Sequence, residues 1–210
     1  MHSNRSLRFL LFPLNLILVL TLLLPLSAHA AKNILVFGDS LSAGYGIAID
    51  KSWVNLLQQE LTRTQSGFGI VNASISGETT TGGRQRIAKA LKQHRPAIVI
   101  VALGANDGLR GYIPADIEAN LNAIITQSQR SGAKVLLVGM KLPPNYGLSY
   151  TTKFNDLFPH LAQKHHILLV PFLLDGVPAD QFQPDNLHPV ADAQQRIMLN
   201  VLQELKHLLH

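Results

Sequence analysis

The chain of 210 residues contains no cysteine. A disulfide framework is therefore excluded, and so is a structural metal site built on thiolates. Membrane attachment through a lipidated cysteine is excluded for the same reason. Charged residues are also scarce, at 15% of the chain, whereas 47% of the residues are hydrophobic. A hydrophobic core must therefore hold the fold together, and the composition is that of a globular protein.

The chain also lacks a basic stripe. Lysine and arginine number 18 against 13 acidic residues, and the mild excess is spread along the chain. Proteins that bind nucleic acids usually gather their basic residues on one face or along one helix. We therefore expect no nucleic-acid partner.

The one long hydrophobic run of the chain lies at its start. Arg5 and Arg8 precede an apolar stretch from Leu10 to Leu26, and Ala28-His29-Ala30 follows. This order is typical of a secretory signal peptide over residues 1–30, cleaved near Ala30. The alternative is an uncleaved membrane anchor, which is disfavoured because a proline and the Ala-x-Ala site end the run.

Removal of the signal peptide leaves residues 31–210, a length typical of a single domain. Since Arg5 and Arg8 leave with the peptide, 16 basic residues face 13 acidic ones and the net charge falls from +5 to +3. We expect a bacterial periplasmic or secreted protein that is monomeric and has no stable membrane insertion after cleavage.

Five short apolar segments follow, separated by segments whose apolar residues recur at helical spacing. We expect strands at residues 33–37, 68–73, 96–103, 134–138 and 167–170. Asp50 is the expected cap of the first helix, which carries Trp53, and Pro189 is expected to open the last one. Other helices are expected at 81–93, 114–132 and 150–164.

Strands that are apolar throughout are typical of a parallel sheet buried on both faces. The pattern predicts an α/β fold with a doubly wound five-stranded parallel sheet in the flavodoxin-like order 2-1-3-4-5. In such sheets ligands bind beyond the carboxyl ends of the strands, where the winding reverses between the first and third strands. Three polar segments should meet there, namely Gly38-Asp39-Ser40, residues 72–77 and residues 104–107.

Ser40 is a candidate nucleophile, with Ser42 as its rival because a serine at that place can also cap a helix. A serine hydroxyl attacks only when a base removes its proton, and the base is usually a histidine that a carboxylate orients. His188 lies three residues after Asp185 in a loop, so one turn can bring carboxylate and imidazole together. The same spacing also fits a turn cap beside a surface histidine.

The other six histidines of residues 31–210 show no spacing typical of metal ligands, and we expect neither a metal nor another cofactor. Acyl transfer also needs hydrogen-bond donors for the oxyanion. The candidates are the Asn106 side chain and the backbone N–H groups of Ser40 and Gly77. Gly77 also fits an ordinary turn at a strand end.

The stretches GDSLSAGYG, NASISGET, LGANDGLRG and DNLHP resemble the four sequence blocks of the SGNH (GDSL) hydrolases. They follow one another in order over residues 38–189, nearly the whole chain after cleavage. The resemblance implies a three-layer α/β/α fold and a serine esterase that acts on acyl thioesters, aryl esters and lysophospholipids. It implies that Ser40 is the nucleophile and an oxyanion donor, that Gly77 and Asn106 are the other donors, and that His188 and Asp185 complete a triad. Asp39 is then expected to brace the turn that aims Ser40.

Apolar side chains at the same edge of the sheet are candidates for binding the acyl group. They follow the third and fourth strands, at Leu109, Tyr112, Leu142 and Tyr146, and can equally anchor their loops. Two other function classes stay open. A metal-dependent phosphoesterase would need more His and Asp ligands at the strand ends, and a non-catalytic binding module would not need Ser, Asn, Asp and His together.

Overall fold

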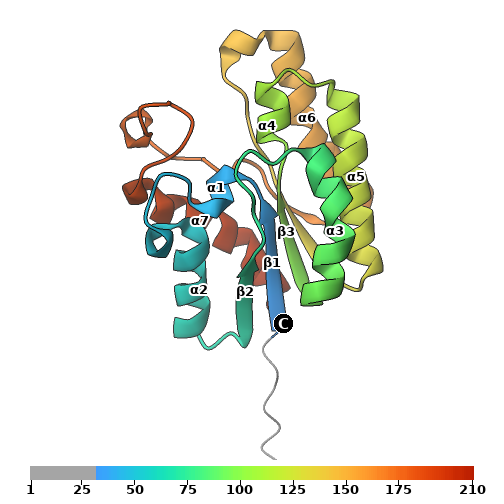
Figure 1. Ribbon diagram of the computed structural model, residues 1–210, viewed down its shortest axis with the longest axis vertical. Helices are drawn as coiled ribbons and strands as arrows, with labels where there is room; N and C mark the ends of the chain where they lie inside the picture. Colours follow the sequence, from blue (N-terminus) through green and yellow to red (C-terminus); the bar gives the residue numbers. More distant parts are fainter. Residues whose placement is uncertain (1–31) are drawn as a thin grey trace, which may run out of the picture. The chain divides into compact units, whose positions relative to one another are not determined.

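A computed structural model describes residues 32–210 of the protein; the expected signal peptide lies outside these residues. Five parallel strands form one sheet: β1 (Lys32–Gly38), β2 (Phe68–Asn72), β3 (Ile98–Ala102), β4 (Lys134–Val138) and β5 (Leu168–Val170). Their order is β2-β1-β3-β4-β5, which confirms the predicted doubly wound topology. Figure 1 shows β1 between β2 and β3, with α1 directly beyond its carboxyl end.

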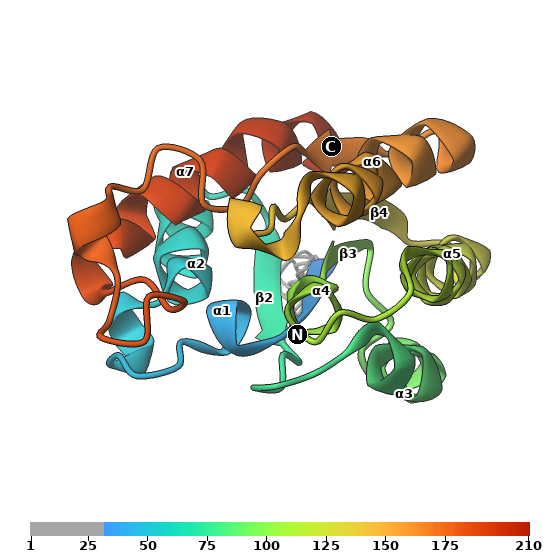
Figure 2. The ribbon, with the colours of Figure 1, turned by 90° about the horizontal axis from the view of Figure 1, so that it is seen from above.

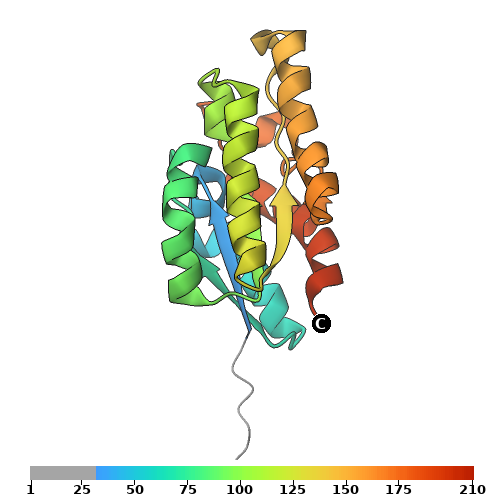
Figure 3. The ribbon, with the colours of Figure 1, turned by 90° about the vertical axis from the view of Figure 1, so that its right-hand side faces the viewer.

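Helices cover both faces of this sheet and complete a three-layer α/β/α fold, as expected. On one face α2 (Trp53–Arg63) packs against α7 (Gln194–Leu205). On the other face α5 (Pro114–Arg130) packs between α3 (Thr80–His94) and α6 (Leu148–His165). Figure 2 shows the two groups of helices on opposite sides of the strands, and Figure 3 shows α3, α5 and α6 side by side.

The central strands are apolar because both of their faces are covered. Residues 34–37 of β1 are fully buried, and Ile98–Ala102 of β3 is at most 5% exposed. Gly38 pairs with Ala102 at the ends of these two strands. The residues that follow each strand therefore leave the sheet beside one another.

Two helix starts differ from the sequence-based expectation. Ser52, not Asp50, caps α2, because its side chain accepts a hydrogen bond from Asn55 N at 3.4 Å. Asp50 lies one turn earlier, in the 3₁₀ helix Ile49–Lys51. The last helix begins at Gln194, because Val190 is extended and a 3₁₀ turn at Ala191–Ala193 precedes it.

A short helix after β3, α4 (Ala105–Leu109), was expected only as a polar strand end. Within residues 32–210 no helix is both long enough and apolar enough to cross a membrane.

Candidate active site

Ser40 is the first residue of the short helix α1 (Ser40–Ala43), directly beyond β1. Asp39 caps this helix with its side chain, which accepts a hydrogen bond from Leu41 N at 3.0 Å. The chain leaves α1 through Gly44, whose φ of 77° lies in the left-handed region that favours glycine. The expectation that Asp39 braces the turn around Ser40 is thus confirmed.

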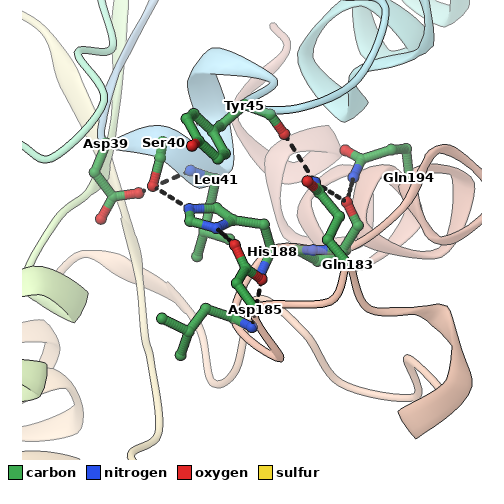
Figure 4. Close-up of polar contacts among 10 residues, drawn as sticks. Asp39, Ser40, Leu41, Tyr45, Gln183, Asp185, His188 and Gln194 are labelled. Carbon is green, nitrogen blue, oxygen red and sulfur yellow. Dashed lines mark hydrogen bonds and ion pairs between the residues drawn. The ribbon is translucent and has the colours of Figure 1, made fainter.

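His188 reaches Ser40 from a loop between β5 and α7. Its Nε2 lies 2.8 Å from Ser40 Oγ, and its Nδ1 lies 2.6 Å from Asp185 Oδ2. The other oxygen of Asp185 accepts hydrogen bonds from the backbone N–H groups of Leu187 and His188. Figure 4 shows the resulting continuous row of polar contacts from Asp185 through His188 to Ser40.

These contacts keep Asp185 ionised. The hydrogen bonds from the backbone and side chain of His188, with one from Leu187 N, lower the pKa of Asp185 to about 2. An ionised carboxylate at Nδ1 favours the tautomer that carries the proton there, which leaves Nε2 free to accept the proton of Ser40. The arrangement suits a histidine that acts as a general base.

Asp39 has the opposite environment, although it adjoins Ser40 in sequence. It is 2% exposed, and burial raises its pKa to about 6. Its Oδ2 lies at 3.4 Å from Asn106 Nδ2. The two carboxylates therefore have different places in the site, because only Asp185 contacts His188 through a hydrogen bond.

Asn106 lies near the nucleophile, since its amide contacts Asp39, and it is also held close to the segment that contains Gly77. Asn106 is the second residue of α4, and its side-chain amide donates to Glu78 O at 3.0 Å, which ties it to the residue after Gly77. Gly77 has a φ of 78° and space where a side chain would begin. The Asn106 amide is thus fixed next to the residue that follows Gly77.

Ser42, the rival nucleophile, lies inside α1 and is fully buried. Among the described residues its hydroxyl has no hydrogen-bond partner. It can therefore reach neither His188 nor a substrate in this conformation. Within residues 32–210, no cluster of three or more His, Asp or Glu side chains is arranged to hold a metal ion.

A cavity of about 320 Å³ opens beside Ser40. Ser40, Asn106 and His188 are among the polar residues that line it, and most of its wall is apolar. Two of the four candidate acyl-binding residues, Leu109 and Leu142, line it. Tyr112 lines a different hollow, together with Asp116, and the Tyr146 hydroxyl donates to Leu109 O at 3.0 Å.

Sequence reasoning missed several residues of this site. The ring of Tyr45 lies 4.6 Å from that of His188, at an angle of 41°. Apolar side chains after β4 and β5 complete the cavity wall: Met140, Phe172, Leu174, Phe182 and Leu187. A position two residues beyond a strand end is a usable signal for Met140 and Phe172. Nothing local marks the others, which come from an irregular segment.

The model of the GDSL-like lipase/acylhydrolase family matches residues 36–196. Esterase TesA of Pseudomonas aeruginosa is 43% identical over 192 residues, which cover 90% of this chain and 96% of that protein.

Two further proteins are similar to this chain. The thioesterase 1/protease 1/lysophospholipase L1 of Escherichia coli K12 is 41% identical over 82% of each chain. A crystal structure of the psychrotrophic esterase EstA from Pseudoalteromonas, inhibited by monoethylphosphonate, superposes with a TM-score of 0.81. It is 37% identical and covers 85% of this chain and 98% of its own.

Proposed function

This chain belongs to the GDSL-like lipase/acylhydrolase family and is a hydrolase of ester bonds, and from this premise we propose that it works through a Ser40–His188–Asp185 triad. The observation that carries the proposal is the row of short contacts, 2.8 Å from Ser40 to His188 and 2.6 Å from His188 to Asp185. These are the contacts that nucleophile, base and orienting carboxylate require.

The first half of the reaction acylates Ser40. His188 Nε2 takes the hydroxyl proton while Oγ forms a bond to the carbonyl carbon of the substrate. The carbonyl oxygen becomes an oxyanion, for which the N–H groups of Ser40 and Gly77 and the Asn106 amide are the proposed donors. The 3.4 Å contact of that amide with Asp39 is long, so the oxyanion can replace it.

Loss of the leaving group completes the acylation: the bond to the leaving alcohol or thiol breaks, and the leaving atom receives the proton from His188. The second half of the reaction releases the acyl group. Water then gives a proton to His188 and attacks the acyl-enzyme, and collapse of the second oxyanion intermediate returns the proton to Ser40. Asp185, ionised throughout because its pKa is about 2, stabilises the imidazolium in both halves.

The apolar cavity supports an acyl group as the part of the substrate that is bound. We propose carboxylic esters and thioesters as the substrate class, including aryl esters, acyl thioesters and lysophospholipids. We also propose that the protein is exported after cleavage near Ala30. An exported enzyme does not meet cytosolic acyl thioesters, so lipid-derived or aryl esters are better candidates. Of the four acyl-binding candidates from the sequence, Leu109 and Leu142 line this cavity, and we propose that they contact the acyl group.

A serine-directed organophosphonate and a p-nitrophenyl ester test the triad. The wild-type protein should gain one adduct in intact mass, and Ser40→Ala should gain none and lose about 10⁴–10⁶ in kcat. Ser42→Ala is the matched control, since the same substitution two residues away removes a buried hydroxyl without a partner. It should keep both the adduct and the wild-type kcat.

Substitutions of the other two triad members should lower kcat by different amounts. His188→Ala should lose nearly as much kcat as Ser40→Ala, and Asp185→Asn should lose less, because it leaves the base in place. Ester hydrolysis by Ser40→Ala at the wild-type rate would contradict the assignment of Ser40 as the nucleophile. Loss of activity on chelation would instead favour the metal-dependent phosphoesterase.

A further inference from the structure

His188 and Asp185 lie on residues 181–190, a segment held together by hydrogen bonds of its own, which we call the histidine loop. Phe182 and Pro189 form an isolated antiparallel bridge, and Gln183 N donates to His188 O at 2.7 Å. Val190 N donates to Gln181 O at 2.9 Å. These bonds place His188 relative to Asp185, but they do not place either residue relative to Ser40.

The side chain of Gln183 links this loop to the segment that follows Ser40. Its Nε2 donates to Tyr45 O at 2.9 Å and to Pro189 O at 3.2 Å. Tyr45 is in turn attached to the nucleophile, because its N–H donates to Ser40 O at 3.2 Å. Figure 4 shows Gln183 between the backbone of Tyr45 and that of the histidine loop.

The chain leaves room for this amide where it would otherwise meet a side chain. Gly46 follows Tyr45 with a φ of 73°, and a Cβ there would come within 2.1 Å of Gln183 Oε1. Gln194 adds a second link of the same kind, since it accepts from Trp53 N at 3.0 Å and its amide donates to Val190 O at 3.3 Å. Two glutamines thus join the histidine loop to residues 45–53.

We propose that Gln183 is a positioning residue that sets the distance between His188 Nε2 and Ser40 Oγ. The inference rests on the proposed triad. Three hydrogen bonds in series connect the two catalytic residues through it: Ser40 O with Tyr45 N, Tyr45 O with Gln183 Nε2, and Gln183 N with His188 O. Each is a bond to backbone, so the amide sets the spacing of two main-chain segments.

This support matters most after the first half of the reaction. Once Ser40 Oγ carries the acyl group it has no proton, so it no longer donates a hydrogen bond to His188. The direct link of the histidine loop to the nucleophile is then lost, while His188 must stay in place to activate water. A misplacement of about 1 Å can cost about 10²-fold in rate, so Gln183 has its largest effect on the acyl-enzyme.

The test replaces the amide by an apolar side chain of the same length. Gln183→Met should lower kcat by about 10- to 100-fold and lower KM as well, because slower hydrolysis of the acyl-enzyme lets that intermediate accumulate. The rate of modification by the organophosphonate should fall as well. Gln181→Met is the matched control, since no hydrogen bond of the described residues involves its side chain; its kcat should equal the wild type.

The outcomes separate this inference from the triad. Wild-type kcat in folded Gln183→Met, with Ser40→Ala inactive, overturns the positioning role and leaves the triad intact. A lower melting temperature with unchanged kcat also overturns it, because the link would then serve folding alone. If Gln183→Met does not fold, Gln183→Glu decides. It keeps the shape but turns a donor toward two carbonyls into an acceptor, so unchanged kcat again overturns the proposal and a loss supports it.

Discussion

Two aspartates near Ser40 have pKa values that are shifted in opposite directions. Asp185 is held ionised by hydrogen bonds from His188 and Leu187, at a pKa of about 2. Asp39 is buried, and its pKa is raised to about 6. The first shift favours the charged partner that a histidine base needs. The second shift opposes charge, which is consistent with a carboxyl group whose contacts are to backbone and amide N–H rather than to a cation.

The raised pKa of Asp39 makes stability depend on pH. Between its ordinary value of 3.8 and about 6, the folded protein binds a proton that the unfolded chain has lost. Asp39 therefore stabilises the fold below pH 4, and this contribution is lost as the pH rises through 6. The full span is about 3 kcal/mol at ~1.4 kcal/mol per unit of pKa.

Replacement of Asp39 by asparagine should remove this dependence. The free energy of unfolding of Asp39→Asn relative to the wild type should rise by about 2–3 kcal/mol between pH 4 and pH 7. Urea titrations of both proteins at each pH measure it. A constant difference across this range would show that Asp39 keeps its ordinary pKa in the folded protein.

At the scale of whole elements, the strands could be predicted and the irregular loops could not. β4 lies at the predicted residues, because a short apolar run between a lysine and a glycine fits few structures other than a buried strand. Ser40 could be found for the same reason, since it comes just after a predicted strand. His188 and Asp185 could be found only from their spacing of three residues and from the resemblance of DNLHP to a family block. By contrast, Asp50 and Ser52 are equally good caps in sequence. The start of α2 is set partly by Gln194, 141 residues away, which accepts from Trp53 N.

The positions of Tyr45 and Gln183 depend on the same kind of distant contact. Gln183 lies in a loop without periodicity, and its partner Tyr45 is 138 residues away. A single sequence holds no local pattern for such a pair. Long-range hydrogen bonds between irregular segments are therefore the part of this site that only the structure provides.

The helix α4, which carries Asn106, and the helix α3, which starts three residues after Gly77, are joined by a buried bond. Thr80, the first residue of α3, donates its hydroxyl to Asp107 of α4 at 2.6 Å, and its N–H contacts the same carboxylate at 2.9 Å. Both side chains are at most 1% exposed. The bond holds the start of α3, just after Gly77, against the helix that carries Asn106.

Thr80→Val should weaken this junction while keeping its shape. It leaves the buried carboxylate with one donor fewer, at a cost of about 1–3 kcal/mol in the free energy of unfolding. We expect kcat to fall several-fold as well, because the donors near Gly77 and Asn106 shift. Thr81→Val is the control, since that threonine is exposed and accepts one bond from Asn120. Equal stability of the two variants would contradict the role of the Thr80 bond.

At the scale of the whole molecule, residues 32–210 contain the core, the sheet and every residue assigned to the site. No cysteine is present in the chain, so its stability rests on the packing of that core. Residues 1–30 contribute none of the catalytic candidates. The proposed cleavage near Ala30 therefore removes a segment that the chemistry does not need.

Expression of the full chain in a bacterium with an intact export system tests this proposal. The purified periplasmic or secreted protein should have an intact mass that begins at Ala31. A chain produced in the cytoplasm from residue 31 onward should match its kcat, KM and melting temperature, because the core and the site lie wholly within it. A reducing agent should change none of these values, since there is no disulfide to lose. Recovery of the uncleaved chain in the membrane fraction would contradict the signal peptide and support the membrane anchor.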